Sequence, residues 1–72
     1  MNHPTSVIDI TLNGASLQLP QGASLADAAT ASGVRPPFAA AVNQQFVPRT
    51  QYAQTPLQDG DAVELISPIT GG

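Results

Sequence analysis

The sequence contains no cysteine, no lysine and no tryptophan, and its one histidine is His3. Without cysteine, neither a disulfide nor a thiolate-bound metal can stabilise the fold. A single histidine near the N-terminus also argues against a histidine metal site. At 72 residues the chain is close to the lower size limit for folding without such a staple. Its stability must therefore come from a small core of Val, Ile, Leu and Ala.

Charged residues are also scarce, and two arginines against five acidic residues give a net charge of −3. Nucleic-acid binding requires many cationic side chains to neutralise phosphates, so no nucleic-acid partner is expected. No apolar stretch approaches the roughly 20 residues of a membrane span. Residues 1–6 lack the basic start and apolar run of a signal peptide. We expect a cytoplasmic protein with no membrane contact.

The first half of the chain predicts a β-hairpin. Apolar residues alternate over Val7–Leu12 and again over Ala15–Leu19, as in half-buried strands. Asn13-Gly14 between them is favoured in tight hairpin turns, because both residues can adopt positive φ. Pro20-Gln21-Gly22 is expected to break the sheet.

A short helix is predicted next. Ser24 is a suitable N-cap, and Asp27 three residues later completes a sequence typical of a capping box. An apolar stripe begins at Leu25 with i, i+3, i+4 spacing. Gly33 is placed to end the helix, which we expect to span about nine residues.

Three more strands are predicted in the second half. Ala39–Asn43 forms the first, Gln44-Gln45 a turn, and Phe46-Val47 a short strand that Pro48 ends. After a turn over Pro56–Asp61, with Gly60 at positive φ, the last strand runs from residue 62 to 66.

This element order indicates an α+β fold of the β-grasp type. We expect a mixed sheet of four to five strands, with one main helix packed on one face and the last strand placed beside the first. The predicted organisation is a flexible arm over 1–6, a domain over 7–68 and a flexible tail over 69–72.

The sequence offers no catalytic group of its own. Its serines lack a nearby histidine in a structured region, and Ser24 already has a structural role. Asp59-Gly60-Asp61 could be mistaken for a metal loop, but the alternating oxygen ligands of a calcium loop are missing, which favours a turn. We therefore expect neither an enzyme nor a metal site.

The most informative segment is Thr70-Gly71-Gly72 at the end of the sequence. Glycine has no Cβ, so these residues could lie flat in a narrow slot and hold the terminal carboxylate in a partner's active site. That carboxylate is ionised at neutral pH and can act as a nucleophile. The alternative is a frayed end without a function.

Several segments in a fixed order resemble the ThiS family, the ubiquitin-like sulfur carriers of thiamin biosynthesis. They are residues 41–49 (AVNQQFVPR), 52–54 (YAQ), 57–61 (LQDGD) and the final Gly71-Gly72. The resemblance covers residues 40–72, whereas the first half agrees by pattern and length. It implies a ubiquitin-like β-grasp fold.

The resemblance further implies that an E1-like, ThiF-like adenylyltransferase activates the Gly72 carboxylate with ATP and Mg²⁺, which the partner would hold. This chain would bind no cofactor. A sulfur donor supplied by a cysteine desulfurase would then convert Gly72 into a thiocarboxylate for a ThiG-like thiazole synthase. Ile69, Thr70 and Gly71 would thread the chain end into the partner's cleft.

Docking residues are less clearly indicated by the sequence. Phe46 and Ile66 could form an apolar area on the sheet face away from the helix, or pack in the core. Acidic residues expected near the tail could meet a basic partner surface, or could simply be solvated. Arg49 matches a family position, although a surface ion pair would explain it equally. The candidates are Phe46, Arg49, Asp59, Asp61, Glu64 and Ile66.

Two other functions remain open. Pro68, shortly before the diglycine, is more similar to MoaD, the small subunit of molybdopterin synthase, which suggests a carrier for that pathway or an accessory subunit. The second open function is that of a ubiquitin-like modifier or interaction module that never carries sulfur. The lack of lysine disfavours chain building by such a modifier but leaves single conjugation open.

Overall fold

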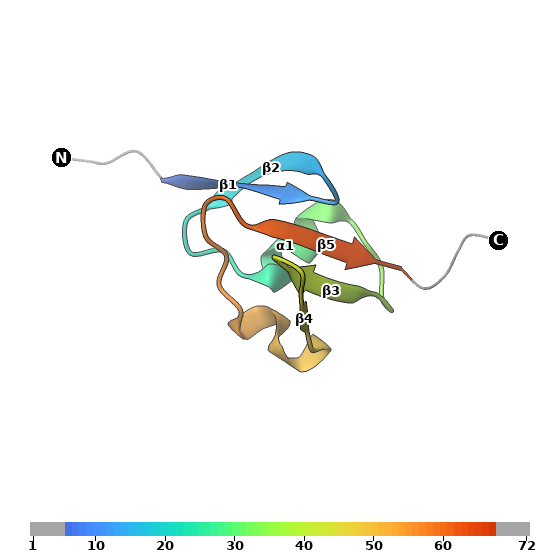
Figure 1. Ribbon diagram of the computed structural model, residues 1–72. Coiled ribbons are helices and arrows are strands. Elements are labelled where there is room, and N and C mark those ends of the chain that lie inside the picture. Colours follow the sequence, from blue (N-terminus) through green and yellow to red (C-terminus); the bar gives the residue numbers. More distant parts are fainter. Residues whose placement is uncertain (1–5, 68–72) are drawn as a thin grey trace.

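The computed structural model describes residues 6–67 and shows one mixed sheet with a helix across one face (Figure 1). The predicted α+β, β-grasp fold with a sheet of four to five strands is confirmed, and the sheet has five. In chain order the elements are β1 (Val7–Leu12), β2 (Ala15–Pro20), α1 (Leu25–Ser32), β3 (Ala39–Val42), β4 (Gln45–Val47), the 3₁₀ helix η1 (Arg49–Gln54) and β5 (Ala62–Ile66).

The sheet has the strand order β2-β1-β5-β3-β4. Its central pair, β1 and β5, is parallel and joins the two ends of the chain, with Leu12 opposite Val63. The two outer pairings and the β3–β5 pairing are antiparallel. The expectation that the last strand lies beside the first is confirmed.

Both hairpins turn on residues at positive φ. Asn13 and Gly14 have φ of 53° and 86°, as predicted. The second turn is formed by Asn43 and Gln44, at 51° and 70°, one residue earlier than predicted. Gln45 belongs to β4, where it pairs with Val42. Asn adopts the left-handed conformation more easily than most residues, which favours this position.

The sheet breaks within Pro20-Gln21-Gly22 as expected, although Pro20 is itself still the last residue of β2 and lies opposite Val7. Strand β2 is at the edge of the sheet, where a residue without a backbone N–H is tolerated. Pairing continues one step further, since the Gln21 N–H donates to the Ser6 carbonyl.

Helix α1 has the predicted caps. The Ser24 hydroxyl accepts from the Asp27 N–H at 3.2 Å, and the Asp27 carboxylate accepts from the Ser24 N–H at 2.8 Å. Gly33 closes the other end at φ 78°, so that the helix has 8 residues, one fewer than expected. Leu25 and Ala28 are fully buried and press the helix against the sheet.

The core is aliphatic, as the composition requires. Strands alternate between buried and exposed residues, and no described side-chain N or O atom is buried without a hydrogen-bond partner. The buried residues are Ile8, Ile10, Leu19, Ala23, Leu25, Ala28, Ala29, Ala40, Val47, Tyr52, Leu57, Val63 and Leu65.

The helix η1 was not predicted, because its sequence has little apolar periodicity. It brings Tyr52 into the core, where the hydroxyl donates to the Phe38 carbonyl at 3.2 Å. The two rings stack with centroids 5.4 Å apart. Thus η1 closes the side of the core between α1 and the edge strand β4.

We predict that Ser24→Ala and Asp27→Ala each lower the free energy of unfolding by about 1 kcal/mol, because each removes one half of the capping box. The two side chains act together, so the double variant should lose less than the sum of the single losses. Urea unfolding followed by circular dichroism measures these values. Strictly additive losses would contradict a reciprocal cap.

Candidate functional site

Strand β5 carries the chain toward the segment that contains the diglycine. Its Val63 and Leu65 side chains are buried, whereas Ala62, Glu64 and Ile66 are exposed, as the alternation predicted. It is paired on both sides, with β1 and with β3. The strand that precedes the diglycine segment therefore lies in the middle of the sheet.

The predicted threading and sulfur-carrying residues lie beyond this strand. Ile69, Thr70, Gly71 and Gly72 are outside the described residues, so their predicted roles stay predictions. The structure does describe β5, the strand that precedes these residues, and its pairing with β1 and β3.

Two of the predicted docking residues form exposed apolar area. Phe46 is 69% exposed and Ile66 is 56% exposed, so neither packs in the core. Ala41 lies opposite Phe46 on one side and opposite Glu64 on the other, which places all three on the same sheet face. This face is the one turned away from the buried side chains. Whether it docks a partner stays a prediction.

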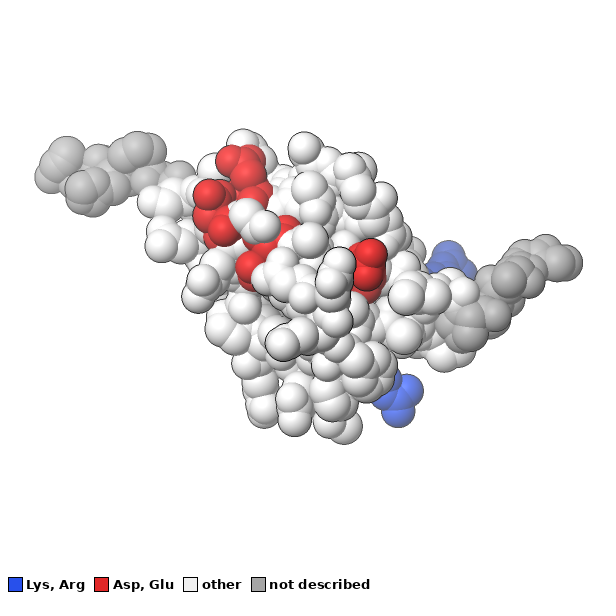
Figure 2. Space-filling model, in the orientation of Figure 1, with Lys and Arg blue, Asp and Glu red and all other residues white. Residues whose placement is uncertain are grey.

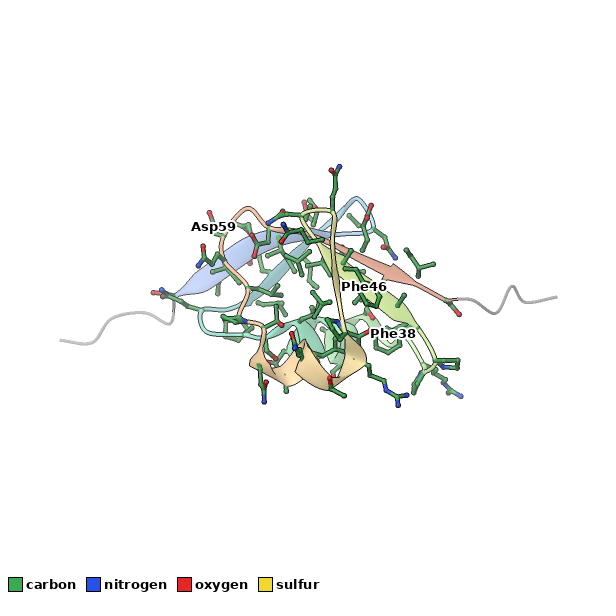
Figure 3. All side chains as sticks on the ribbon, turned by 60° about the horizontal axis from the view of Figure 1, so that its bottom comes forward. Phe38, Phe46 and Asp59 are labelled. Atoms are coloured by element: carbon green, nitrogen blue, oxygen red, sulfur yellow. The ribbon has the colours of Figure 1, made fainter. Side chains whose placement is uncertain are left out.

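The expectation that Asp59 and Asp61 lie near the tail is wrong. Both precede β5, and Ile66 is at that strand's other end. In Figure 3, Asp59 lies near the start of β1, and its Oδ1 accepts from the Asp9 N–H at 2.7 Å.

Asp61 also has a structural role. Its carboxylate accepts from the Gln58 N–H at 2.8 Å and from the Asn43 amide at 2.9 Å. Both aspartates thus shape the loop that leads into β5, and only Glu64 among the predicted acids lies within that strand.

The charges on the molecule are separated. Figure 2 shows most acidic groups near the start of β1 and both arginines toward the end of the molecule where β5 finishes. Arg49 is exposed at the first position of η1. The region that leads to the chain end is therefore bordered by cations and by the apolar side chains of Phe46 and Ile66.

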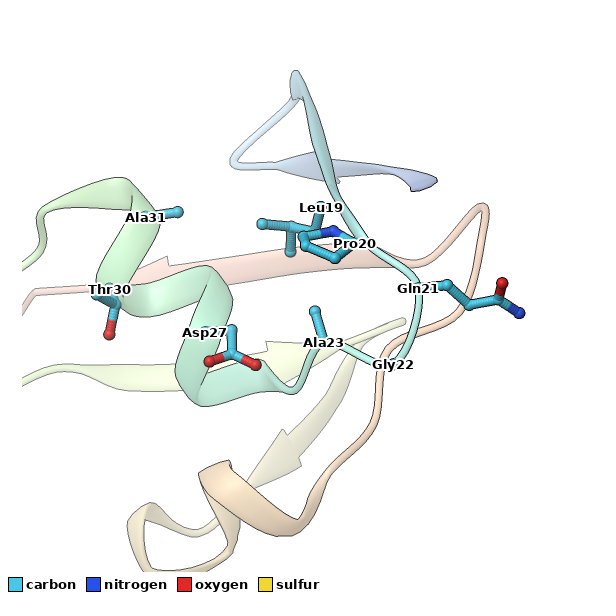
Figure 4. Close-up of a pocket in the computed structure, with 8 residues that line it drawn as sticks. All are labelled: Leu19, Pro20, Gln21, Gly22, Ala23, Asp27, Thr30 and Ala31. Atoms are coloured by element: carbon cyan, nitrogen blue, oxygen red, sulfur yellow. The ribbon is translucent and has the colours of Figure 1, made fainter. Parts of the chain in front are cut away.

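A hollow lies elsewhere, between the end of β2 and α1, and has a volume of about 490 Å³ (Figure 4). It is wide open, and its lining includes Leu19, Pro20, Ala23 and Asp27. The Asp27 carboxylate already caps α1. Within residues 6–67, no group of three or more His, Cys, Asp or Glu is arranged to hold a metal.

The sequence model of the ThiS family matches residues 5–72 of this chain. The chain belongs to the ThiS family. The resemblance inferred from residues 40–72 is thereby confirmed, and the match extends to the first half as well.

Two relatives of this ThiS family member are informative. The "Sulfur carrier protein ThiS" of Escherichia coli (strain K12) is 56% identical over 34 residues. That match covers 47% of this chain and 52% of the relative, so it spans about half the length of the curated protein. A crystal structure of thiamine biosynthesis protein ThiS from Geobacter metallireducens covers 90% of this chain and 100% of its own, with a TM-score of 0.75 and 23% identity. This likeness supports the same fold.

The fold of this ThiS family member thus matches the resemblance from which it was expected. No helix in residues 6–67 is long and apolar enough to cross a membrane.

The sequence analysis missed the side chains of the two turn asparagines. Both contact β5: Asn13 bonds to Leu65, near the strand's end, and Asn43 bonds to Ala62, at its start. The sequence marked Asn13 as a turn residue, but nothing in it indicated a partner 52 residues away.

We predict that Phe46→Thr and Ile66→Thr each change the free energy of unfolding by less than about 0.5 kcal/mol, because both side chains are exposed and Thr suits a strand. Val63→Thr is the matched control on the opposite face of β5. It should cost about 1–3 kcal/mol, since it places a hydroxyl in the core. Urea unfolding decides, and a loss at Phe46 as large as at Val63 would show that Phe46 packs in the core.

Proposed function

We propose that this protein is a cytoplasmic sulfur carrier, whose Gly72 carboxylate is adenylated and then converted to a thiocarboxylate that supplies sulfur for thiazole formation in thiamin biosynthesis. The observation that carries this proposal is the ThiS family match, which runs through to Gly72. The name of the E. coli relative, a sulfur carrier protein, supports it.

The chemistry required of the chain is simple. One oxygen of the Gly72 carboxylate attacks the α-phosphorus of ATP, forming an acyl-adenylate and releasing pyrophosphate. The terminal sulfur of a donor persulfide then attacks the acyl carbon and displaces AMP. A second thiol cleaves the resulting acyl disulfide, leaving the thiocarboxylate on Gly72 and a disulfide on the donor side.

Partner enzymes supply the catalytic groups for these steps. An E1-like, ThiF-like adenylyltransferase holds ATP and Mg²⁺, a cysteine desulfurase charges the donor, and a ThiG-like thiazole synthase accepts the sulfur. The carrier contributes a chain end that fits a narrow site: residues 69–72 reach about 13 Å at roughly 3.3 Å per residue. Two glycines at the end keep this segment thin.

We assign partner docking to the exposed sheet face beside the end of β5. Phe46 and Ile66 supply apolar area on it, and Glu64 and Arg49 supply charges at its surface. Buried apolar area holds a complex together, whereas surface charges mainly set the rate of encounter. Asp59 and Asp61 are left out of this surface, because their carboxylates shape the loop before β5.

A carrier for molybdopterin synthesis is the second candidate, and Pro68 shortly before the diglycine is the feature that favours it. The two functions use the same terminal chemistry and differ in the sulfur acceptor. Stable copurification with a large molybdopterin-synthase-like subunit, instead of turnover with a thiazole synthase, would favour this alternative.

We predict that Gly72→Val and deletion of Gly72 abolish sulfur loading, because a side chain widens the segment and restricts its dihedral angles. The protein is incubated with a ThiF-like enzyme, ATP, Mg²⁺ and sulfide, and its intact mass is measured. The unchanged protein should exchange one oxygen for one sulfur.

The unfolding midpoint of both variants serves as the control and should stay unchanged. Normal loading of either variant would rule out the proposed role of Gly72. An unchanged protein that is never loaded would favour a modifier or an interaction module.

We further predict that Phe46→Thr raises the carrier's KM in this loading assay about tenfold, because truncation of a large side chain that anchors an interface costs more than about 1 kcal/mol. The value of kcat should change little, since the chain end is untouched. Thr50→Ala, an exposed position in η1, is the control. An unchanged KM for Phe46→Thr would remove Phe46 from the docking surface.

A further inference from the structure

The last residues of β5 have no β1 residue opposite them to accept and donate backbone hydrogen bonds. The parallel pairing of β1 with β5 places Thr11 opposite Ala62 and Leu12 opposite Val63. The Asn13 N–H still donates to the Val63 carbonyl at 2.9 Å. Beyond that point the chain turns away into β2, so no strand residue of β1 lies opposite Leu65.

The Asn13 side chain takes the place of the missing strand residue. Its Oδ1 accepts from the Leu65 N–H at 2.9 Å, and its Nδ2 donates to the Leu65 carbonyl at 3.2 Å. A side-chain amide has the same donor and acceptor as a peptide group, so it can extend a ladder by one step. The left-handed conformation of Asn13, at φ 53°, accompanies this geometry.

On its other side, β5 is paired to its last residue. Ala39 lies opposite Ile66 and Ala40 opposite Leu65 in the antiparallel register with β3. The Leu65 side chain is 6% exposed and fixed in the core. With the Asn13 amide in place, β5 is held from both sides up to the point where the chain continues toward Gly72.

We propose that Asn13 is a positioning residue for the chain end: its side-chain amide fixes β5 at Leu65 and so sets where the segment that delivers Gly72 begins. This inference rests on the proposed function. Loss of the amide would release the β1 side of the strand as far back as Val63 and lengthen the segment between Gly72 and the last residue that is held from both sides. A longer segment lowers the fraction of time that the carboxylate spends in its reactive position.

The chain provides a matched control in Asn43. It also begins a two-residue hairpin turn, at φ 51°, and its backbone N–H donates to the Ala62 carbonyl at 2.7 Å. Its Oδ1 accepts from the Ala62 N–H at 2.9 Å. Its Nδ2 donates to the Asp61 carboxylate instead of to a β5 carbonyl. Both asparagines thus accept from a β5 N–H, but at opposite ends of the strand, and only Asn13 acts beside the chain end.

The experiment compares Asn13→Gly with Asn43→Gly, since glycine accepts both φ values and removes the side-chain contacts. The added backbone entropy of the unfolded chain is common to both variants. Amide hydrogen exchange, which needs no partner enzyme, is the first readout. Asn13→Gly should raise the exchange rate of the Leu65 amide about tenfold more than it raises that of the Ala62 amide. Asn43→Gly should raise the exchange rate of the Ala62 amide about tenfold more than that of the Leu65 amide.

Sulfur loading by the ThiF-like enzyme with ATP, Mg²⁺ and sulfide is the second readout. Asn13→Gly should lower kcat about tenfold, within the range that misplacement of a reacting group can cost. The carrier's KM should stay within about twofold, because the docking face is unchanged. Asn43→Gly should leave both constants within about twofold.

Equal effects of the two variants on loading, or protection of the Leu65 amide in Asn13→Gly, would overturn the inference. If the unchanged protein is not loaded at all, the proposed function fails, and the exchange rates alone decide whether Asn13 holds β5. Should Asn13→Gly fail to fold, Asn13→Asp replaces it. That variant keeps the acceptor for the Leu65 N–H but places an oxygen against the Leu65 carbonyl, so the loading comparison with Asn43→Gly is its deciding readout. Equal kcat values of the two variants would overturn the inference.

Discussion

The parallel pairing of β1 with β5 is the interaction on which the rest of this structure depends. It joins the two ends of the chain in the centre of the sheet, and both hairpins are attached to it. Because β5 has a neighbour on each side, its buried residues Val63 and Leu65 cannot leave the core without opening the whole sheet. A protein of this size thereby carries the segment before its diglycine on an inner strand of the sheet.

This arrangement separates stability from reactivity. The core is built mainly from aliphatic side chains, while the carboxylate of Asp27 caps a helix and that of Asp59 holds a loop. The proposed chemistry requires only the terminal carboxylate and two glycines without side chains. Substitutions in the core should therefore affect function through folding, whereas those at the end should affect function alone.

Local patterns accounted for much of the fold. Asn13-Gly14, the Ser24–Asp27 capping box and the alternation over 62–66 each depend on neighbouring residues, so the sequence displays them directly. The helix η1 was missed because it depends on distant contacts, such as Tyr52 with Phe38, and the second turn was predicted one residue too late. At the candidate site, the alternation of β5 predicted which of its side chains are exposed. The bond between Asn13 and Leu65 could not be predicted, because it joins residues that only the folded sheet brings together.

The two turn asparagines show why a carrier of this kind benefits from side chains that extend a ladder. A longer β1 would also hold Leu65, but it would move the β1–β2 turn and with it the edge strand β2. An amide on the first turn residue adds one step of pairing without adding a residue to the strand. Asn13 adopts the left-handed conformation that the hairpin turn requires, and in that conformation its side chain bonds to Leu65 of β5. One residue thus serves both the turn and the strand that leads to the chain end.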